Sequence, residues 1–421
     1  MYQVTRLGNG LTLATAEMPH MASVSLGLWV ATGGRWEPPE LNGVCHFIEH
    51  MVFKGTRRRS ARQISQSVEG IGGYLNAYTS EENTCFYSRA RQDRLDDLLD
   101  VLADMILNSR FDRLDIDRER NVIKEEWAMY LDQPHVHVQE LLNATLWPDQ
   151  PLGRPLTGTP ATLDRLQRKQ LLGFMGDHYL ASTTLLVAAG CVSHRRFLKA
   201  AVPYVARFNS GERPGHVPAR NDQRRPCLNV STKEVEQTQF ALGVRTCSRH
   251  DERRFALRLL NTVLGENMSS RLFQVIREDR GLAYNISSAI SFFDDTGDLV
   301  VSAGLDTDNL AETLRLVLRE LRAMTERAPT PAELRRARDY VLGQFDLSLE
   351  STESQMMWLG EQLLGYGRIV SPAAIKQRIA RITPAEIRGV ARDFFRRDRL
   401  NLALVSPLKR GRRLQAQLDR F

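Results

Sequence analysis

The sequence has few cysteines, and their spacing gives them no shared role. Five occur among 421 residues, at positions 45, 85, 191, 227 and 247, and no CxxC pair is present. An odd number without paired spacing is typical of reduced thiols in an intracellular protein and argues against a disulfide-stapled domain. Cys45 adjoins a candidate metal ligand, but we interpret it as a small buried residue, because neighbouring helix positions point to different faces.

Long apolar runs and a targeting segment are also absent. No stretch reaches the roughly 18 uninterrupted apolar residues that a membrane-spanning helix needs. The N-terminal MYQVTRLGNG has neither the apolar centre of a signal peptide nor an Arg/Ser-rich amphipathic leader. We therefore expect a cytoplasmic protein without membrane contact, bacterial rather than mitochondrial, or a mature form that has lost its leader.

The composition is that of a soluble globular protein with a basic excess. Hydrophobic residues make up 42%, charged residues 25%, and the net charge is +7. The densest basic clusters, at 57–59 and 409–413, are short and carry no interleaved aromatic residues, so we interpret them as solvated surface. No nucleic-acid partner is expected.

The chain divides into two nearly equal halves that follow one plan. Residues 209–226, NSGERPGHVPARNDQRRP, are rich in Pro, Gly and Arg and predict a linker between domains 1–208 and 227–421. Strands followed by helices, twice over, predict two homologous α+β domains, each a mainly antiparallel sheet packed with helices. The expected strands are 11–16, 23–32, 73–79, 84–90, 237–244, 283–292 and 297–304, and the long helices are 95–109, 112–130, 252–264, 269–279, 310–327 and 331–349.

The segment His46-Phe47-Ile48-Glu49-His50 is the main chemical signal. On a helix, positions i and i+4 lie on one face, so His46 and His50 are placed to bind one zinc ion together. Glu49 projects to the same side and is expected to act as a general base rather than a ligand. HxxEH is the inverted form of the common zinc-peptidase motif HExxH.

A third ligand is expected from the helix predicted at 112–130. Glu119 and Glu126 are seven residues apart and therefore share one helix face, whereas Glu125 points to the side. Glu126 would complete a His₂Glu set for one Zn²⁺ per chain, which leaves the fourth position open as catalytic zinc requires. Glu119 would support the site from one to two turns away.

At these residues the sequence resembles the pitrilysin/insulinase superfamily of zinc peptidases, in its half-length branch with the mitochondrial processing peptidase. The matching segments are LNGVCHFIEHMVFKGT at 41–56, GGYLNAYTSEENTCFY at 72–87, ERNVIKEEW at 119–127, PLGRPLTGT at 151–159, MSSRLFQVIREDRGLAY at 268–284 and LSLESTESQMMWLG at 347–360. Glu126 follows His50 by 76 residues, the long gap that the resemblance implies.

The resemblance implies an architecture and further site residues. The two halves would form half of a clam-shell that closes around an unfolded peptide. The strand at 73–79 would pair with the substrate backbone, with Asn76 and Ala77 at the receiving positions. Arg277 and Tyr284 match the family's Arg/Tyr pair, which would assist catalysis from the second half; the alternative is a salt-bridged surface arginine and a core tyrosine.

The resemblance also implies partners. A half-length chain that carries both the zinc motif and the Arg/Tyr pair is expected to form a homodimer with sites completed in trans, or a heterodimer with a related chain. The function expected is a zinc metalloendopeptidase for unfolded peptides or presequence-like segments. The alternative is a noncatalytic or chaperone-like subunit of a peptidase-type heterodimer, although none of His46, Glu49, His50 and Glu126 is degenerate.

Overall fold

The computed structural model describes residues 2–409 and 411–421 and divides into two compact units. The first unit contains the described residues up to Ala128 together with Arg154–Val217 and Asp346–Ile369. The second contains Met129–Gly153, Pro218–Phe345 and Val370–Phe421. The units differ from the continuous domains 1–208 and 227–421 expected from the sequence, because one segment of each half belongs to the other unit.

The first unit is built on a six-stranded sheet in the order β1-β2-β6-β3-β5-β4. Neighbouring strands are antiparallel except for β2 and β6, which run parallel. The strands are β1 (Tyr2–Arg6), β2 (Thr12–Glu17), β3 (Ser23–Val30), β4 (Tyr74–Thr79), β5 (Thr84–Arg91) and β6 (Thr184–Gly190). In the described part of the chain β4 pairs only with β5, so it is an edge strand.

The second unit is built on a five-stranded sheet in the order β7-β11-β8-β10-β9. Here too one neighbouring pair, β7 and β11, is parallel and the others are antiparallel. The strands are β7 (Cys227–Thr232), β8 (Thr238–Thr246), β9 (Ala283–Phe292), β10 (Gly297–Leu305) and β11 (Asn401–Ser406). The prediction of two α+β domains with mainly antiparallel sheets is confirmed.

Helices cover both faces of each sheet. Those of the first unit are α1 (Val44–Val52), α2 (Ala61–Glu69), α3 (Leu95–Asn108), most of α4 (Arg113–Asp132), α6 (Pro160–Leu163), α7 (Arg168–His178), α8 (His194–Val205) and α12 (Thr352–Tyr366). Those of the second unit are α5 (Pro134–Leu146), α9 (Arg253–Asn261), the π-helical η6 (Thr262–Glu266) and η7 (Phe273–Glu278), α10 (Leu310–Glu326), most of α11 (Pro331–Leu347), α13 (Pro372–Ala380), α14 (Pro384–Phe394) and α15 (Arg412–Asp419).

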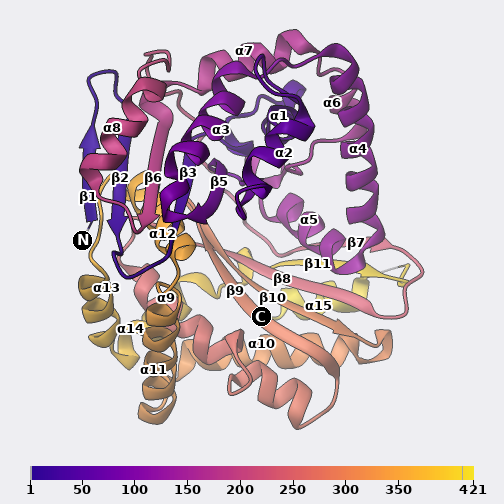
Figure 1. Cartoon of the computed structure of the whole chain (residues 1–421). Helices are drawn as coiled ribbons and strands as arrows, with labels where there is room; N and C mark the ends of the chain where they lie inside the picture. The colour runs from indigo at the N-terminus through magenta and orange to yellow at the C-terminus, as the bar shows by residue number, and fades with distance from the viewer. Residues whose placement is uncertain (1, 410) are drawn as a thin grey trace. The chain divides into compact units, whose positions relative to one another are not determined.

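One face of each sheet is covered by a helix from the other half of the chain. In the first unit α12 packs on β2, β3 and β6, and Figure 1 shows this orange helix beside the indigo and magenta strands. In the second unit α5 packs on β7, β8 and β11. Each sheet therefore has apolar residues on both faces. One set lies under the helices of its own half, and the other lies under α12 or α5, which we call the exchanged helices because each packs on the sheet of the other half.

Glycine lets the exchanged helices approach closely. A Cβ atom on Gly27 of β3 would lie 2.4 Å from the Met356 sulfur of α12, and one on Gly360 of α12 would lie 2.5 Å from the Trp29 ring. In the second unit, a Cβ on Gly243 of β8 would lie 3.1 Å from side chains of Leu142 and Leu146 on α5. Both sheets thus use a glycine in a central strand where a helix crosses it.

Several elements differ from the sequence expectation. The strands β1, β6, β7 and β11 were not expected, although β6 and β11 lie inside their sheets. The helix expected at 252–264 is α9 followed by the π-helix η6, and that expected at 269–279 is largely the π-helix η7. No helix or strand lies between Val205, the end of α8, and Cys227, the start of β7, in the region of the expected linker.

Among the described residues, none of the helices is both long and apolar enough to cross a bilayer. All five cysteines are free thiols.

Candidate metal centre

The helix α1 presents a polar face above a fully apolar one. Val44, Phe47, Ile48 and Met51 are buried in the core of the first unit. The opposite positions carry the HxxEH residues, whose side chains are only partly accessible. The amphipathic pattern of α1 therefore fixes this helix to the core and leaves His46 and His50 together on its outer face. Their ring centroids lie 4.6 Å apart.

The helix α4 brings Glu126 to these two histidines. The Glu126 Oε2 atom lies 3.7 Å from His46 Nε2 and 3.6 Å from His50 Nε2. One potential ligand atom from each of the three side chains lies within 4.8 Å of the others. The structure thus brings together three residues from two helices separated by a long stretch of chain.

This donor set fits a zinc ion. Two ligands that each lie ~2.0–2.1 Å from zinc at a tetrahedral angle are about 3.3 Å apart. The observed separations of 3.6 and 3.7 Å are slightly wider, and small side-chain rotations would close the difference. Two imidazole nitrogens with one carboxylate oxygen are also a common set for catalytic zinc.

A second carboxylate, that of Glu119, orients His50 through its Nδ1 atom. Glu119 Oε2 lies 3.1 Å from His50 Nδ1, and Lys54 Nζ lies 2.7 Å from the other oxygen of Glu119. Burial alone would lower the pKa of His50, but the carboxylates of Glu126 and Glu119 outweigh it and raise the pKa above its ordinary value. The ring of His50 is therefore held at Nδ1 by Glu119, as metal-binding histidines commonly are, while its Nε2 faces Glu126.

His46 lacks such a support. Its Nε2 faces Glu126, whereas its Nδ1 is buried and has no hydrogen-bond partner in the described part of the chain. Burial, together with the neighbouring His50, lowers the pKa of His46 to about 4 against the opposing attraction of Glu126. The imidazole of His46 is therefore neutral at physiological pH, the form that binds metals.

Glu49, next to His50 on α1, contacts the edge strand β4. The Thr79 hydroxyl of β4 donates a 2.6 Å hydrogen bond to Glu49 Oε2. Burial raises the pKa of Glu49 above its ordinary value, against the opposing effect of this hydrogen bond. On the same strand, Asn76 is exposed and its side-chain oxygen accepts a hydrogen bond from the Ala77 N–H at 2.8 Å.

Arg277 and Tyr284 lie together in the second unit. Arg277 belongs to η7 and Tyr284 to β9, and the guanidinium lies 5.3 Å from the centre of the tyrosine ring and 4.8 Å from that of Phe273. Tyr284 is 76% exposed, so the alternative interpretation of a core tyrosine is wrong. The pair therefore presents an aromatic hydroxyl and a cation on the surface of this unit.

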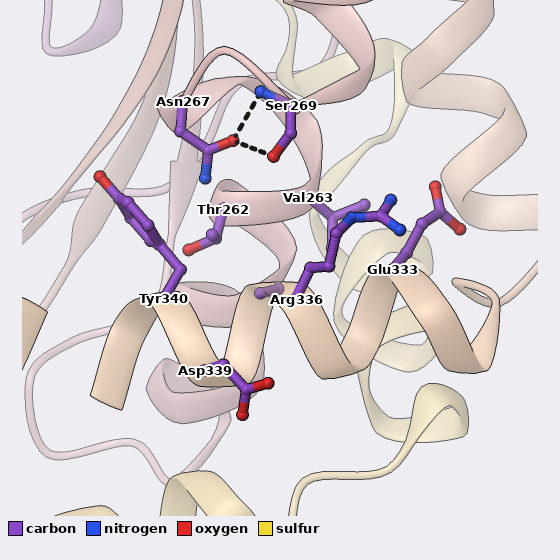
Figure 2. A pocket seen from close by; sticks show the side chains of 9 residues that line it. Thr262, Val263, Asn267, Ser269, Glu333, Arg336, Asp339 and Tyr340 are labelled. Carbon is purple, nitrogen blue, oxygen red and sulfur yellow. Dashed lines mark hydrogen bonds between the residues drawn. The ribbon is translucent and has the colours of Figure 1, made fainter. Parts of the chain in front are cut away.

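A separate cavity of about 330 Å³ lies in the second unit, between α11 and the turn that precedes η7 (Figure 2). The Asn267 side-chain oxygen accepts hydrogen bonds from the backbone N–H and hydroxyl of Ser269, drawn as dashed lines. Glu333 of α11 is held by Arg271, whose Nε lies 2.7 Å from its Oε1. These contacts anchor the segment leading to Arg277.

Sequence reasoning missed two polar groups in the metal centre. Lys54 follows His50 at the same four-residue interval that separates His50 from His46, and this spacing was an available signal. Thr79 had no such signal, because its contact with Glu49 depends on how β4 packs beside α1. The interpretation of Cys45 as a buried residue is confirmed, and burial raises the pKa of its thiol well above the ordinary value.

The fold and this donor set define a peptidase-type protein, and comparison with known families agrees. Residues 12–160 match the family model described as insulinase (peptidase family M16). Residues 165–341 match the model described as the peptidase M16 inactive domain. The second of these spans much of the region that forms the second unit.

Sequence relatives cover almost the whole chain. A protein of Streptomyces coelicolor named as the uncharacterized zinc protease SCO5738 is 36% identical over 96% of this chain and 89% of its own length. The uncharacterized zinc protease YmxG of Bacillus subtilis is 36% identical over 95% of this chain and 97% of its own. The chain therefore belongs to the insulinase (M16) family of the pitrilysin/insulinase superfamily, and at this level it is a zinc peptidase.

Solved structures share the fold. A protease from Helicobacter pylori superimposes with a TM-score of 0.90 at 19% identity, covering 97% of this chain and 100% of its own. A structure described as a peptidase M16 inactive domain, from Pseudomonas fluorescens, has a TM-score of 0.90 at 18% identity and covers 97% of this chain and 98% of its own. At such low identity these likenesses show the α+β fold alone.

Proposed function

We propose that the chain is a zinc metalloendopeptidase that hydrolyses unfolded peptides, with one Zn²⁺ held by His46, His50 and Glu126. The observation that supports this most directly is the convergence of these three side chains, with Nε2–Oε2 distances of 3.7 and 3.6 Å. Glu49 lies beside them on the same helix without being needed as a ligand, and Thr79 fixes its carboxylate.

The proposed roles follow from the chemistry of each group. Bound zinc supplies a Lewis acid and lowers the pKa of a coordinated water to about 7. Glu49 accepts a proton from the attacking water and donates it to the leaving amine. Glu119 and Lys54 orient His50 through its Nδ1. Arg277 and Tyr284 supply a cation and a hydroxyl for the substrate carbonyls.

An extended peptide backbone is the proposed substrate. Among the described residues β4 pairs with β5 on one side only, so its other edge presents backbone N–H and C=O groups to a partner strand. Thr79 belongs to β4 and contacts Glu49, which supports the proposal that a strand docked at Asn76 and Ala77 would lie next to the general base. Recognition through the backbone favours broad selectivity for unfolded segments.

Three matched variants on two helices test the proposal. Glu126→Gln should lose bound zinc and hydrolysis together, because it removes the charged ligand. Glu49→Gln should keep its zinc yet lose about 10²–10⁴-fold in kcat, because it removes only the proton acceptor. Glu125→Gln, at an exposed neighbouring position of α4, should change neither. The measurements are zinc content by mass spectrometry and cleavage of a quenched peptide library.

The same experiment decides between an enzyme and a noncatalytic or chaperone-like subunit. Cleavage that survives both chelation and Glu49→Gln would refute the proposed mechanism. Zinc uptake without cleavage of any peptide, alone or with a co-expressed relative, would favour the noncatalytic function.

We further propose that the chain acts as a homodimer whose sites are completed in trans, with a heterodimer as the alternative. The high exposure of Tyr284 supports this, because an aromatic residue on the surface is available to a partner. Mixing Glu49→Gln chains with Tyr284→Phe chains should restore part of the activity that each lacks. A mixture that forms mixed dimers but stays inactive would contradict the shared site, and the oligomeric mass of the purified chain separates the two kinds of dimer.

A further inference from the structure

The start of the metal-binding helix α1 is capped from seven residues upstream. Both carboxylate oxygens of Glu37 accept hydrogen bonds there, Oε2 from the Gly43 N–H at 2.8 Å and Oε1 from the Cys45 N–H at 2.9 Å. The Asn42 amide donates a third bond to Oε2 at 2.9 Å. Glu37 is only 2% exposed, so these bonds are shielded from water. A buried carboxylate thus satisfies backbone donors that the first turn of a helix leaves free.

The helix cannot supply this cap from its own N-terminal residue. Gly43 holds that position with φ +94°, and no side chain there bonds to the helix. A Cβ atom on Gly43 would lie 2.8 Å from both the Gly158 Cα and the Thr157 carbonyl oxygen. The usual capping residues Ser, Thr, Asp and Asn are therefore excluded by the close approach of the segment around Gly158, and the cap must come from elsewhere.

Glu37 is itself held in place by that neighbouring segment. Its backbone carbonyl accepts a 2.8 Å hydrogen bond from Arg154 Nη1. The Asn42 amide that reaches Glu37 also donates to the Pro155 carbonyl at 3.0 Å. Glu37, Asn42 and residues 154–158 thus form one buried hydrogen-bonded support for the first turn of α1.

The two histidines on α1 depend on this support to different degrees. His50 is oriented by Glu119, which bonds to its Nδ1. His46 has no polar partner at Nδ1 among the described residues, and it directly follows Cys45, whose N–H is bound by Glu37. The position of the His46 ring is therefore set by the backbone of the first turn and by packing.

We propose that Glu37 is a positioning residue for the metal centre, which fixes the first turn of α1 so that His46 meets Glu126 and His50 at one zinc ion. This inference rests on the proposed function. It assigns no contact with substrate to Glu37, which acts through the helix backbone.

The test compares Glu37→Gln with a control of equal burial. Glutamine keeps the size of the side chain but replaces one acceptor oxygen by a donor, so one of the Gly43 and Cys45 N–H groups loses its partner. The control is Asp104→Asn, because Asp104 is 1% exposed and also accepts three hydrogen bonds, from Thr56, Arg59 and Asn108, at 2.7 Å each. A general loss of stability should follow from either variant.

Two readouts distinguish positioning from a merely structural role. Glu37→Gln should weaken zinc affinity by about tenfold or more, measured by competition with a chromophoric chelator. In the metal-free protein it should also speed hydrogen exchange in a peptide covering residues 43–47. Asp104→Asn should leave zinc affinity within about twofold of wild type. Asn42→Ala removes one of the three hydrogen bonds to the Glu37 carboxylate and should weaken zinc affinity less. It replaces Glu37→Gln as the test variant if Glu37→Gln does not fold.

The outcomes separate this inference from the proposed function. Unchanged zinc affinity in both Glu37→Gln and Asn42→Ala would overturn the inference, and so would an equal loss in Asp104→Asn. A wild-type chain that takes up no zinc would instead refute the proposed function, and with it the positioning role of Glu37.

Discussion

The two units share a strand order but differ in chemistry. The order β2-β6-β3-β5-β4 of the first corresponds position by position to β7-β11-β8-β10-β9 of the second, including the single parallel pair. The first unit adds β1 at its edge. In each unit a helix follows the strand at the third of these positions, α1 after β3 and α9 after β8.

The difference is concentrated in these helices. α1 reads VCHFIEHMV and carries two histidines and a glutamate, whereas α9 reads RRFALRLLN and carries none. Both bury an apolar face in their own core. The comparison teaches that the shared scaffold depends on apolar residues and glycine, and that the candidate metal centre adds only a few polar side chains, on the outer face of α1 and on α4.

The largest expected effect concerns zinc, because the cluster of candidate zinc ligands found among the described residues lies in the first unit. Saturating the metal-free chain with zinc should slow hydrogen exchange in α1 and α4 and leave β8 and β10 unchanged. With zinc at 1,000 times its Kd, the stabilisation linked to binding is about 4 kcal/mol. The measurement is exchange by mass spectrometry, with and without chelator. Equal protection of both units would show that the metal centre is not confined to the first.

Local patterns in the sequence were sufficient to place the candidate metal ligands on two helix faces. The four-residue interval between His46 and His50 and the seven-residue interval between Glu119 and Glu126 each place side chains on one helix face. These intervals depend only on helix geometry, so they hold wherever the helices pack. That the two faces meet was expected from the resemblance, and the structure brings the side chains together.

The sequence did not predict how segments far apart in the chain pack against one another. β6 and β11 are short and almost wholly apolar, a pattern that does not distinguish a buried strand from a piece of helix. The exchange of α5 and α12 also left no local signal, because an amphipathic helix does not encode which sheet it covers. Glu37 was missed for a similar reason, since its cap acts across a loop rather than within the helix.

An intermediate effect is expected where the exchanged helix meets the first sheet. Gly360→Ala should destabilise the first unit by about 1–3 kcal/mol, because its methyl group would lie 2.5 Å from the ring of the fully buried Trp29. The control is Gly389→Ala in α14, where a methyl group would meet nothing within 4 Å. That variant should stabilise the second unit by about 0.5–1 kcal/mol, because alanine favours the helix. Urea unfolding followed by exchange in β3 and in β8 assigns each change to its unit; a neutral Gly360→Ala would mean that α12 can shift.

The smallest effect concerns an ion pair in the second unit and depends on pH. Burial alone would raise the pKa of Glu333, but hydrogen bonds from Arg271 and Thr330 outweigh it and lower the pKa to about 2. Its stabilising contribution is therefore complete above the ordinary glutamate pKa of about 4.3 and is lost as the pH falls toward 2. Glu333→Gln should destabilise the second unit by about 1–3 kcal/mol at pH 7 and by clearly less at pH 3, since the wild type has by then lost part of the same contribution. Exchange in β9 and β10 at both pH values measures this difference, and a cost that does not shrink on acidification would show that Glu333 stabilises the unit by packing rather than by its charge.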